Sequence, residues 1–570
     1  MYKISYNVIL IAPIIVLLSA CTGGRNEPPI DVSVTPFKAQ ISAAESPKDY
    51  IDQLGCLNCH GGATLPNELK TKAPDLSLAG SRFKPEYIFN YLLNPTQVRN
   101  HIGLSRMPNF GFDEREALAL THYLSSKRAV QHVQFPDFSD EGNVRLGEKE
   151  FNEQACSTCH MANGRGNNVI SDLSNMGSKL NPEWMKQFIA APAAFQKESI
   201  MPGLLYHFNT DSTALISSVD NAEEKIENLS AYLLSLEAPD YDEQLDTYET
   251  IKESNPEISV ELGQIIYQAQ NCAGCHQSNP DGEWKEMVAP DLMTIKSRIN
   301  KAWLAEYVKK PHAVRPFGFY PGSGSRMPNF NLTEIEIENI VRFIYNEENN
   351  QKQNHIEAPS RFVSNKIKVL LDEKLPCLGC HSLGGQGGKI APELANLSKR
   401  LNSDYLAAVV TDPAVAMPGT IMPKISMPEN MRDQLIGYLL YNKDTVAEGK
   451  YLSLVDHPIT LQDASLTPES IYLSKCAICH GEKGNANGFN AEYLATQPTK
   501  HADSSYMTRR PDDTLFDGVF AGGDILNRSH LMPAWGNALS NDEIKGLVTY
   551  MRGLCNCSPP KWSTDNKKLK

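Results

Sequence analysis

The sequence predicts an all-α protein in which five similar domains follow one another, joined by polar linkers. A chain of 570 residues is too long for a single hydrophobic core. One five-residue pattern, Cys-x-x-Cys-His, recurs five times, with 99 to 116 residues between successive starts. Capping-box patterns precede an apolar stripe at helical spacing downstream of three copies. These patterns pair Asp113 with Glu116, Thr333 with Glu336 and Ser540 with Glu543.

The composition argues against a nucleic-acid-binding protein. The chain holds 54 Lys and Arg against 67 Asp and Glu, a formal net charge of −13, whereas nucleic acids are bound by clustered basic side chains. Such a charge suits a basic partner or simple solubility. The apolar fraction of 41% is modest for a globular protein. This indicates that something besides side chains fills the cores.

The first residues predict a targeting segment. Lys3 supplies a positive charge, and residues 8–18 are almost wholly apolar but too few to span a membrane. The small residues before Cys21 resemble a bacterial lipoprotein signal, in which the cysteine carries the lipid. We expect residues 1–20 to be removed, Cys21 to be lipidated and residues 21–47 to form a flexible stalk. An uncleaved anchor and an ordinary secretion signal are the alternatives.

The residue after the lipidation site bears on location. In lipoproteins an Asp there suggests retention in the inner membrane, whereas this chain has Thr22. We therefore expect a lipid-anchored protein on the periplasmic side of the cell envelope, at the outer membrane.

The recurring pattern has the spacing that covalent haem attachment requires. Two thiols three residues apart on one helical turn reach the vinyl groups of one porphyrin, and the adjacent imidazole ligates the iron. A zinc site would need a second ligand pair, and a thioredoxin-like thiol pair would need a βαβ context. The sequence therefore predicts five haem c groups. Their attachment residues are Cys56, Cys59 and His60; Cys156, Cys159 and His160; Cys272, Cys275 and His276; Cys377, Cys380 and His381; and Cys476, Cys479 and His480.

A methionine followed by proline lies 41 to 52 residues after every attachment histidine. A thioether is a common second axial ligand of haem iron, although methionine more often fills cores. The fourth repeat offers Met417, Met422 and Met427, and only Met422 keeps the 16-residue spacing to an aromatic residue of the closing helix found in the first and third repeats. The expected ligands are Met107, Met201, Met327, Met422 and Met532. A long polar insertion after Met201 makes its assignment the weakest.

Each repeat resembles a class I cytochrome c domain. In that all-α fold a first helix with an aromatic residue precedes the attachment motif, and a last helix crosses the first. Tyr50, Phe151, Tyr267 and Tyr472 stand before four of the motifs, whereas the fourth has only aliphatic residues there. The resemblance implies five tandem domains and a C-terminal tail. Their residues are 48–126, 143–236, 259–346, 363–442 and 467–554, with the tail at 555–570.

The same resemblance implies a partner for each ligand histidine. In the family a proline carbonyl accepts the proton of the histidine and fixes its ring. Pro74, Pro290 and Pro392 match that position, and Pro498 is the candidate in the fifth domain. Ser171 replaces proline in the second domain, where a backbone carbonyl can still accept the bond.

Domains 1 and 2 match domains 3 and 4 at fixed offsets, which predicts a two-haem module used twice. Arg82 aligns with Arg298, and Met201 aligns with Met422. The two arginines either neutralise haem propionates or are solvated. Domain 5 stands apart, and its Met-Pro-Ala-Trp string resembles haem domains attached to certain haem–copper oxidases.

Polar stretches separate the domains. They cover residues 127–142, 237–258, 347–362 and 443–466. The acidic residues 240–257 are expected to form a solvated connector, with a docking strip for a basic partner as the alternative. Cys555 and Cys557 lie outside any haem motif and either pair with each other or crosslink subunits.

These expectations converge on a multihaem c-type cytochrome that transfers electrons between redox partners in the cell envelope through five His/Met-ligated haems. We expect protein partners and a lipid anchor, with no nucleic acid and no small-molecule substrate. A haem subunit of a larger dehydrogenase or respiratory complex is one alternative. The other is a haem enzyme, a peroxidase or reductase, with one open haem and His207 as its acid–base candidate. Haems closed on both faces favour a carrier over an enzyme.

Overall fold

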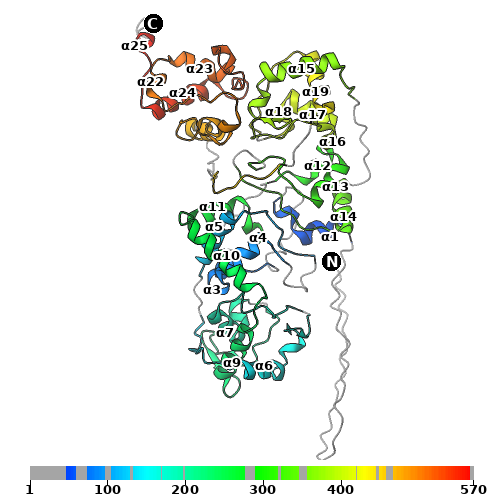
Figure 1. Ribbon diagram of the computed structural model, residues 1–570, viewed down its shortest axis with the longest axis vertical. Helices are drawn as coiled ribbons and strands as arrows, with labels where there is room; N and C mark the ends of the chain where they lie inside the picture. Colours follow the sequence, from blue (N-terminus) through cyan, green and yellow to red (C-terminus); the bar gives the residue numbers. More distant parts are fainter. Residues whose placement is uncertain are drawn as a thin grey trace, which may run out of the picture. The chain divides into compact units, whose positions relative to one another are not determined.

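A computed structural model describes residues 46–59, 73–96, 104–128, 133–168, 170–196, 199–275, 289–318, 323–345, 356–418, 420–444, 449–457 and 467–564. This part of the chain is all-α, and its strands form three two-stranded antiparallel hairpins (Figure 1). Cys21, the signal segment and residues 21–45 of the expected stalk lie outside the described residues, as do His60 and His276. None of the described helices has the length and apolarity needed to cross a membrane.

The first and third repeats have a similar succession of elements. The first contains α1 (Pro47–Leu54), η1 (Cys56–Asn58), η2 (Leu76–Leu78), α3 (Ala79–Arg82), α4 (Pro85–Leu93) and α5 (Glu114–Ser125). The third contains α11 (Val260–Ala269), η5 (Cys272–Gly274), α12 (Leu292–Arg298), α13 (Lys301–Lys309) and α14 (Glu334–Tyr345). The capping boxes expected before α5 and α14 are both present, at Asp113 with Glu116 and at Thr333 with Glu336.

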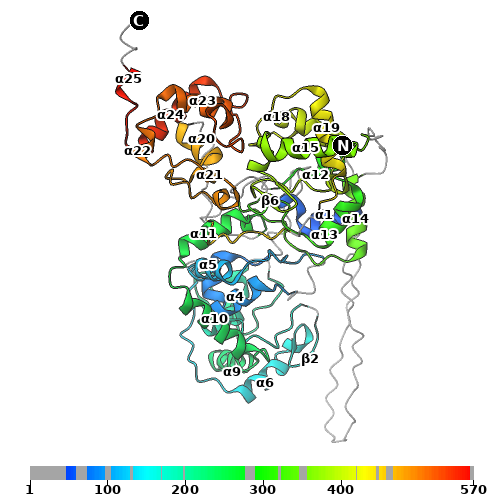
Figure 2. The same cartoon turned by 45° about the horizontal axis from the view of Figure 1, so that its top comes forward.

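The first helices of these two repeats are exchanged. α1 buries Ile51 in a cluster with Ile340 of α14, and α11 packs on α5, where the rings of Tyr267 and Tyr123 lie 5.2 Å apart. Figures 1 and 2 show blue α1 among green α12, α13 and α14, and green α11 beside blue α5. The family resemblance implied that each first helix crosses the closing helix of its own repeat. Here each crosses that of the other, because the two closing helices present equivalent apolar faces.

The second and fourth repeats keep their first helices. The second contains α6 (Val144–Glu153), η4 (Cys156–Thr158), β1 (Met161–Ala162), β2 (Arg165–Gly166), α7 (Pro182–Ala190), α8 (Pro192–Phe195), β3 (Tyr206–Phe208), β4 (Leu215–Ser217) and α9 (Ala222–Leu234). The fourth contains α15 (Arg361–Glu373), η6 (Pro376–Gly379), β5 (Ser382–Leu383), β6 (Gln386–Gly387), α16 (Leu397–Arg400), α17 (Ser403–Thr411), α18 (Pro413–Ala416) and α19 (Glu429–Tyr441). α6 packs on α9 through Phe151 and Tyr232, with ring centroids 5.7 Å apart, and α15 packs on α19.

A small hairpin follows the attachment histidine in both of these repeats. β1 pairs with β2, and β5 pairs with β6. Gly166 and Gly387 lie in β2 and β6 with φ of 100° and 107°. A Cβ atom there would lie 2.3 Å and 2.5 Å from the carbonyl oxygens of His160 and His381. Only glycine allows this close approach and this backbone conformation together.

The fifth repeat folds on its own first helix. It contains α20 (Pro468–Lys475), α21 (Ala477–His480), η7 (Phe489–Tyr493), α22 (Ser504–Met507), α23 (Asp512–Ala521), η8 (Asp524–Leu526), α24 (Asn541–Cys555) and α25 (Lys561–Thr564). α20 packs on α24, where the rings of Tyr472 and Tyr550 lie 5.1 Å apart. The capping box expected at Ser540 opens α24. Cys555 and Cys557 form a disulfide with each other.

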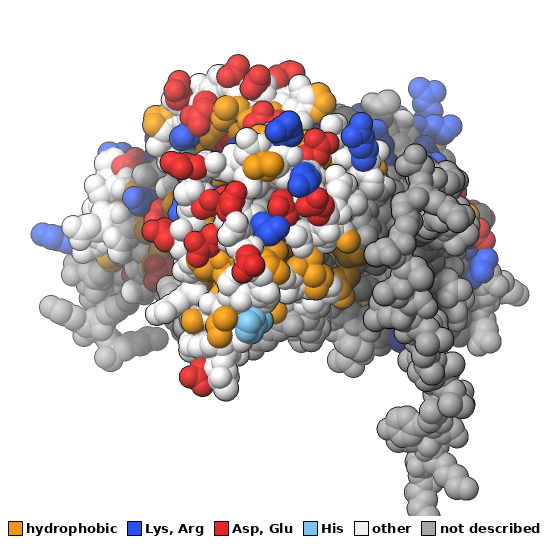
Figure 3. Space-filling model, turned by 90° about the horizontal axis from the view of Figure 1, so that it is seen from below, with side chains coloured by type: hydrophobic (Ala, Val, Ile, Leu, Met, Phe, Trp, Pro, Cys, Tyr) orange, Lys and Arg blue, Asp and Glu red, His pale blue; other side chains and the backbone are white. Residues whose placement is uncertain are grey.

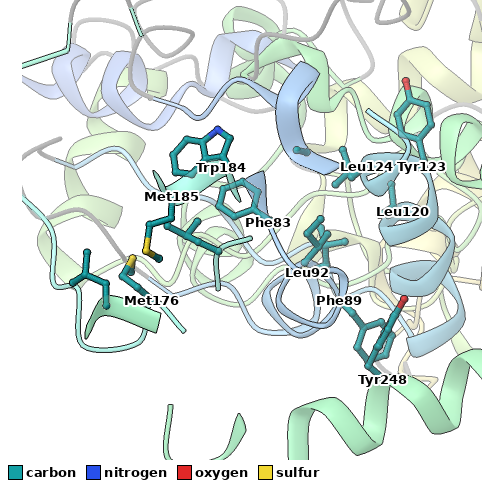
Figure 4. Close-up of a cluster of buried hydrophobic side chains, with 14 of the residues drawn as sticks. Phe83, Phe89, Leu92, Leu120, Tyr123, Leu124, Met176, Trp184, Met185 and Tyr248 are labelled. Carbon is teal, nitrogen blue, oxygen red and sulfur yellow. The ribbon is translucent and has the colours of Figure 1, made fainter. Parts of the chain in front are cut away.

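Equivalent bridges join the two halves of each module. Phe83 bridges Leu180 between the first and second repeats, and Ile299 bridges Leu401 between the third and fourth. Figure 4 shows Phe83 beside Trp184, with Met185 and Met176 continuing the core into the second repeat. The body of the first repeat contributes a second group of buried side chains. Figure 4 labels Phe89, Leu92, Leu120, Tyr123 and Leu124 of this repeat, with Tyr248 of the connector after the second repeat beside Phe89.

The acidic connector after the second repeat is a helix, α10 (Tyr241–Ser254), that packs on α4. The Tyr241 hydroxyl donates to Glu86 at 2.7 Å. Tyr248 is buried, with its ring 5.6 Å from that of Phe89. The expectation of a solvated connector is therefore wrong for this face, because the two tyrosines give an otherwise acidic helix an apolar side.

Candidate haem-attachment sites

Each attachment motif forms a tight helical turn. The N–H of the second cysteine donates to the carbonyl of the first in all five copies, over 3.1 to 3.3 Å. In three copies the residue before the turn is left-handed, with φ of 71° at Gly55, 56° at Ala155 and 53° at Asn271. This reversal ends the first helix and starts the turn that carries both thiols. The geometry agrees with two thioether bonds to one porphyrin.

The described histidines of the attachment motifs are held by backbone carbonyls. Nδ1 of His160 donates to the Ser171 carbonyl at 3.1 Å, and Nδ1 of His381 donates to the Pro392 carbonyl at 2.7 Å. Both partners were expected. A hydrogen bond at Nδ1 fixes the ring and makes Nε2 the nitrogen that can ligate a metal, as is usual for metal-ligating histidines.

The fifth repeat departs from the expectation. Nδ1 of His480 donates to the carbonyl of Thr499 at 2.8 Å, so Pro498 is not the acceptor. His501 stacks on His480, with ring centroids 4.2 Å apart, and it hydrogen-bonds Tyr472 at 2.9 Å. The longer loop of this repeat moves the acceptor by one residue.

Burial shifts the pKa values of cysteines and of a histidine in the attachment motifs. It raises the pKa of the Cys56, Cys59, Cys272 and Cys380 thiols to about 12. A thioredoxin-like thiol needs a lowered pKa, so this environment does not suit thiol redox chemistry. Burial also lowers the pKa of His381 to about 4. Its imidazole is therefore neutral near pH 7, which is the form that ligates a metal.

A zinc ion is the alternative to haem that Cys and His side chains could bind. Within the described ranges, no group of three or more His, Cys, Asp or Glu side chains is arranged to hold a metal ion. The donor sets that the motifs do offer are two thiols with one imidazole, which fits haem c.

The expected methionine ligands differ in their surroundings. The Met201 and Met422 N–H groups donate to hydroxyls two residues earlier, at Ser199 over 3.2 Å and at Thr420 over 3.1 Å. The two repeats thus share one turn before the methionine. Of the alternatives in the fourth repeat, the Met417 sulfur contacts Arg315 at 4.0 Å.

One continuous apolar cavity connects three attachment motifs. Its walls include Cys56, Cys377 and Cys476 with the methionines Met327, Met422 and Met532. A cavity lined by thiols, imidazoles and thioethers is the kind of site that haem c fills.

Partly buried arginines in this cavity offer partners for haem propionates. Burial, together with the nearby Arg315, lowers the pKa of Arg400 to about 10. Nε of Arg298, also in the cavity wall, is buried with no hydrogen-bond partner among the described residues. Arg298 also stacks on Tyr405 at 4.9 Å, as Arg82 stacks on Trp184 at 4.7 Å. Cations buried together require anions, so these side chains fit the two carboxylates of a haem.

The attachment turns contact one another in two pairs. The Asn58 side chain donates to the Cys275 sulfur at 3.3 Å, and the Asn271 side chain donates to the Asn58 carbonyl at 2.8 Å. This joins the first and third motifs. In the second pair, the fully buried Asn490 donates to the Gly379 carbonyl at 2.8 Å and to Cys479 at 3.3 Å.

His207 is the acid–base candidate of the open-haem alternative. His207 lies in β3 with its side chain exposed, and Nδ1 hydrogen-bonds the Ser218 hydroxyl at 2.9 Å. The arrangement directs His207 to its own hairpin partner strand and to solvent.

Several residues of these sites escaped the sequence analysis. They are Asn58, Asn271, Asn490, Thr499, His501, Arg315 and Arg400. Two of the asparagines lie within or beside an attachment motif, which was a signal available in the sequence. The others depend on contacts between distant segments.

Comparison with known proteins matches three stretches of the chain to family models. Residues 144–237 and 260–347 match cytochrome c, and residues 463–551 match cytochrome c oxidase, cbb3-type, subunit III. The cbb3-type cytochrome c oxidase subunit CcoP of Azospirillum brasilense is 26% identical over 185 residues, which is 31% of this chain and 58% of that protein. Cytochrome c oxidase subunit 2 of Alkalihalophilus pseudofirmus is 25% identical over 167 residues, which is 27% of this chain and 46% of that protein. The chain thus spans about half the length of the curated relatives it matches.

Two solved structures are also similar. The KustC0563 c-type cytochrome is 26% identical and aligns over 15% of this chain and 96% of its own, with a TM-score of 0.13. A chain of the Kuenenia stuttgartiensis reducing HAO-like protein complex Kustc0457/Kustc0458 is 16% identical over 36% of this chain and 99% of its own, with a TM-score of 0.14. The matched domain models and the recurring attachment motifs together support a multi-domain c-type cytochrome.

Proposed function

We propose that this protein carries five haem c groups and transfers electrons between protein partners in the cell envelope. In this proposal it is tethered by a lipid at Cys21 on the periplasmic side, at the outer membrane. The five attachment motifs support the haem count, and the matched cytochrome c domains support the class of protein. A bound haem c carries one electron when its iron changes between the ferric and ferrous states.

The observation that carries the proposal is the direct contact between attachment turns. Asn58 bonds Cys275 across the first and third motifs, and Asn490 bonds the Gly379 carbonyl across the fourth and fifth. Electron transfer requires cofactors at short and fixed separations. The chain provides them by packing attachment turns against each other, whereas linkers alone would leave the domains free to move apart.

The axial residues set what the sites can do. The carbonyls of Ser171, Pro392 and Thr499 hold each imidazole in one orientation. Thioether ligands close the second face and raise the reduction potential relative to a second histidine. Sites closed in this way suit electron carriage.

The haem count is tested by intact-mass measurement of protein purified from its native host. We expect the mature chain plus five haem masses and a lipid. Fewer haems, or zinc at the motifs, would contradict the proposal. A redox titration followed by optical spectra should then show low-spin haem throughout, with methionine–iron bands.

The location is tested separately by changing Cys21 to Ser. We expect the wild-type protein in the membrane fraction and the variant in the soluble periplasmic fraction. A variant that stays membrane-bound would contradict lipid anchoring without affecting the haem count.

A second candidate function is that of a haem subunit in a larger respiratory complex. The relatives named above are oxidase subunits, which favours this reading. The face in Figure 3 mixes acidic and basic side chains with apolar patches, a composition compatible with a protein partner. Size measurement of the native protein in mild detergent distinguishes the two, because a stable complex would elute far above the mass of a single chain.

A further inference from the structure

We propose that the first and third haem sites are each completed by the other repeat. Met327 ligates the iron held by the Cys56 motif, and Met107 ligates the iron held by the Cys272 motif. This pairing rests on the haem attachment proposed above. It goes beyond it by assigning two ligands across repeats that lie far apart in the sequence.

The exchange begins with the first helices. α11 closes on α5, where a Cβ on Gly263 would lie 1.9 Å from the Ala119 carbonyl oxygen. Gly147 has the same relation to Asn228 within the second repeat, at 1.9 Å. The third motif therefore sits on the closing helix of the first repeat as the second motif sits on its own. α1 takes the reciprocal place on α14, with Ile51 fully buried there.

Backbone contacts around the first motif point the same way. The Ala289 N–H donates to the Cys59 carbonyl at 3.1 Å. In the fourth repeat Ala391 donates to Cys380 at 2.9 Å, and the next residue is the proline that orients the ligand histidine. Pro290 follows Ala289 in the same way. The third repeat thus supplies its histidine-orienting loop to the first motif.

Each methionine lies near the attachment turn that packs on the closing helix of its own repeat. Met327 lines the same cavity as Cys56 and Cys59. Met107 and Cys272 both pack against one buried core, which includes Tyr123 of α5 and Tyr267 of α11. The structure therefore places each methionine with the attachment turn of the other repeat.

The two Ser-Arg-Met-Pro-Asn-Phe strings cross at the centre of this exchange. Asn109 and Asn329 exchange two backbone hydrogen bonds of 2.8 Å and 2.7 Å. The arginine before each methionine reaches the capping-box carboxylate of the other repeat. These ion pairs join Arg106 to Glu336 at 2.9 Å and Arg326 to Glu116.

Connection length agrees with the exchange. His60 and His276 each precede their matching proline by 14 residues, whereas His160 and His381 precede Ser171 and Pro392 by 11. The longer connections belong to the repeats whose helices are exchanged. A longer connection lets a first helix reach a body other than its own.

The test removes one haem by mutation. It then determines which methionine substitution causes no further loss of the methionine–iron absorption band. In full-length protein with Cys56→Ala and Cys59→Ala, Met327→Ala should cause no further loss of the methionine–iron absorption band. Met107→Ala in the same background should remove one more haem's share. The opposite result would mean that each repeat ligates its own iron, and the pairing would be overturned.

The parent variant separates this failure from that of the proposed function. Intact mass should show the loss of a single haem from the Cys56→Ala, Cys59→Ala protein. No loss of haem mass would contradict attachment at this motif and, with it, the pairing. In the reciprocal background, Cys272→Ala with Cys275→Ala, it is Met107→Ala that should cause no further loss of the methionine–iron absorption band. Met327→Ala should reduce the band there.

A haem-independent measurement checks the helix exchange itself. Tyr123→Leu and Tyr267→Leu should shift the denaturation midpoint non-additively, because the two rings are in contact. Tyr123→Leu and Tyr50→Leu should be additive. Coupling of Tyr123 to Tyr50 in place of Tyr267 would overturn the exchange.

Discussion

The even-numbered and odd-numbered repeats use similar sequences in different ways. The second repeat closes α6 on α9 through Phe151 and Tyr232, and the fourth likewise closes on itself. The first and third repeats trade α1 and α11, so that neither is complete without the other. In this duplicated module, the second and fourth repeats each pack on their own first helix. The first and third repeats connect the two copies by exchanging theirs.

The joint, formed by the exchanged helices α1 and α11 with the closing helices α14 and α5, contains a buried ion pair. Arg326 and Glu116 are buried, at 2% and 1% side-chain exposure, and the Leu454 N–H also donates to Glu116 at 2.7 Å. The exchanged repeats are thus linked by charge as well as by apolar packing. Substitutions in the exchanged repeats test how much these contacts contribute to stability.

The largest effect is expected from Glu116→Ala. This change leaves the Arg326 charge buried without its carboxylate, which costs about 3–5 kcal/mol of unfolding free energy. Chemical denaturation followed by haem absorbance and far-UV circular dichroism measures it. The control is Glu338→Ala, which removes an exposed ion pair to Arg342 and should cost about 0–1 kcal/mol. Equal losses in the two variants would show that the buried pair does not hold the joint.

A smaller loss is expected from Gly263→Ala. The added Cβ would meet the Ala119 carbonyl oxygen at 1.9 Å and force α11 away from α5, a cost of about 1–3 kcal/mol. Gly553→Ala is the matched control, because nothing lies within 4 Å of a Cβ at that position of α24. That control should be neutral or stabilise by about 0.5–1 kcal/mol. Thermal denaturation of both variants decides whether the crossing is as close as described.

Acid should weaken the joint through Glu336. Burial alone would raise the pKa of Glu336, but hydrogen bonds from Arg106 and Thr333 lower it below its usual value. A carboxyl with a lowered folded pKa stabilises the fold above its unfolded pKa of about 4.3, and that contribution is lost as pH falls through the folded pKa. We expect unfolding free energy to fall more steeply in this range for the wild type than for Glu336→Gln. Identical pH profiles would exclude the contribution.

The smallest effect is expected from Ser171→Ala in the second repeat. The main-chain carbonyl remains the acceptor for His160, and only the hydroxyl at 3.3 Å is lost. Stability should change by less than about 0.5 kcal/mol, and the haem spectrum should be unchanged. A shifted spectrum would show that the hydroxyl, and not the carbonyl, orients the ring.

The sequence predicted the features that depend on neighbouring residues. The all-α class, the attachment turns and the capping boxes at Asp113, Thr333 and Ser540 follow from local patterns. The carbonyl partners at Ser171 and Pro392 follow from the resemblance to class I cytochrome c domains. These patterns are read within one turn or one loop, so no knowledge of distant packing is needed.

The exchange could not be predicted because the repeats are too alike. Glu116 and Glu336 open both closing helices, and Tyr123 and Phe343 stand at equivalent places on them. Either first helix therefore matches either face, and the choice depends on contacts far apart in the sequence. The Thr499 acceptor depends in the same way on the path of a loop, and the packing of α10 depends on a face that its acidic composition obscures.

The exchanged helices also bear on the order in which the molecule is made. A chain emerges N-terminus first, so α1 and its attachment turn exist long before α14 can cover them. Until then Ile51 and its neighbours have no apolar face to bury against within their own site. The first cofactor site to be synthesised would therefore be finished only after the second, and its completion would require that the third repeat has folded.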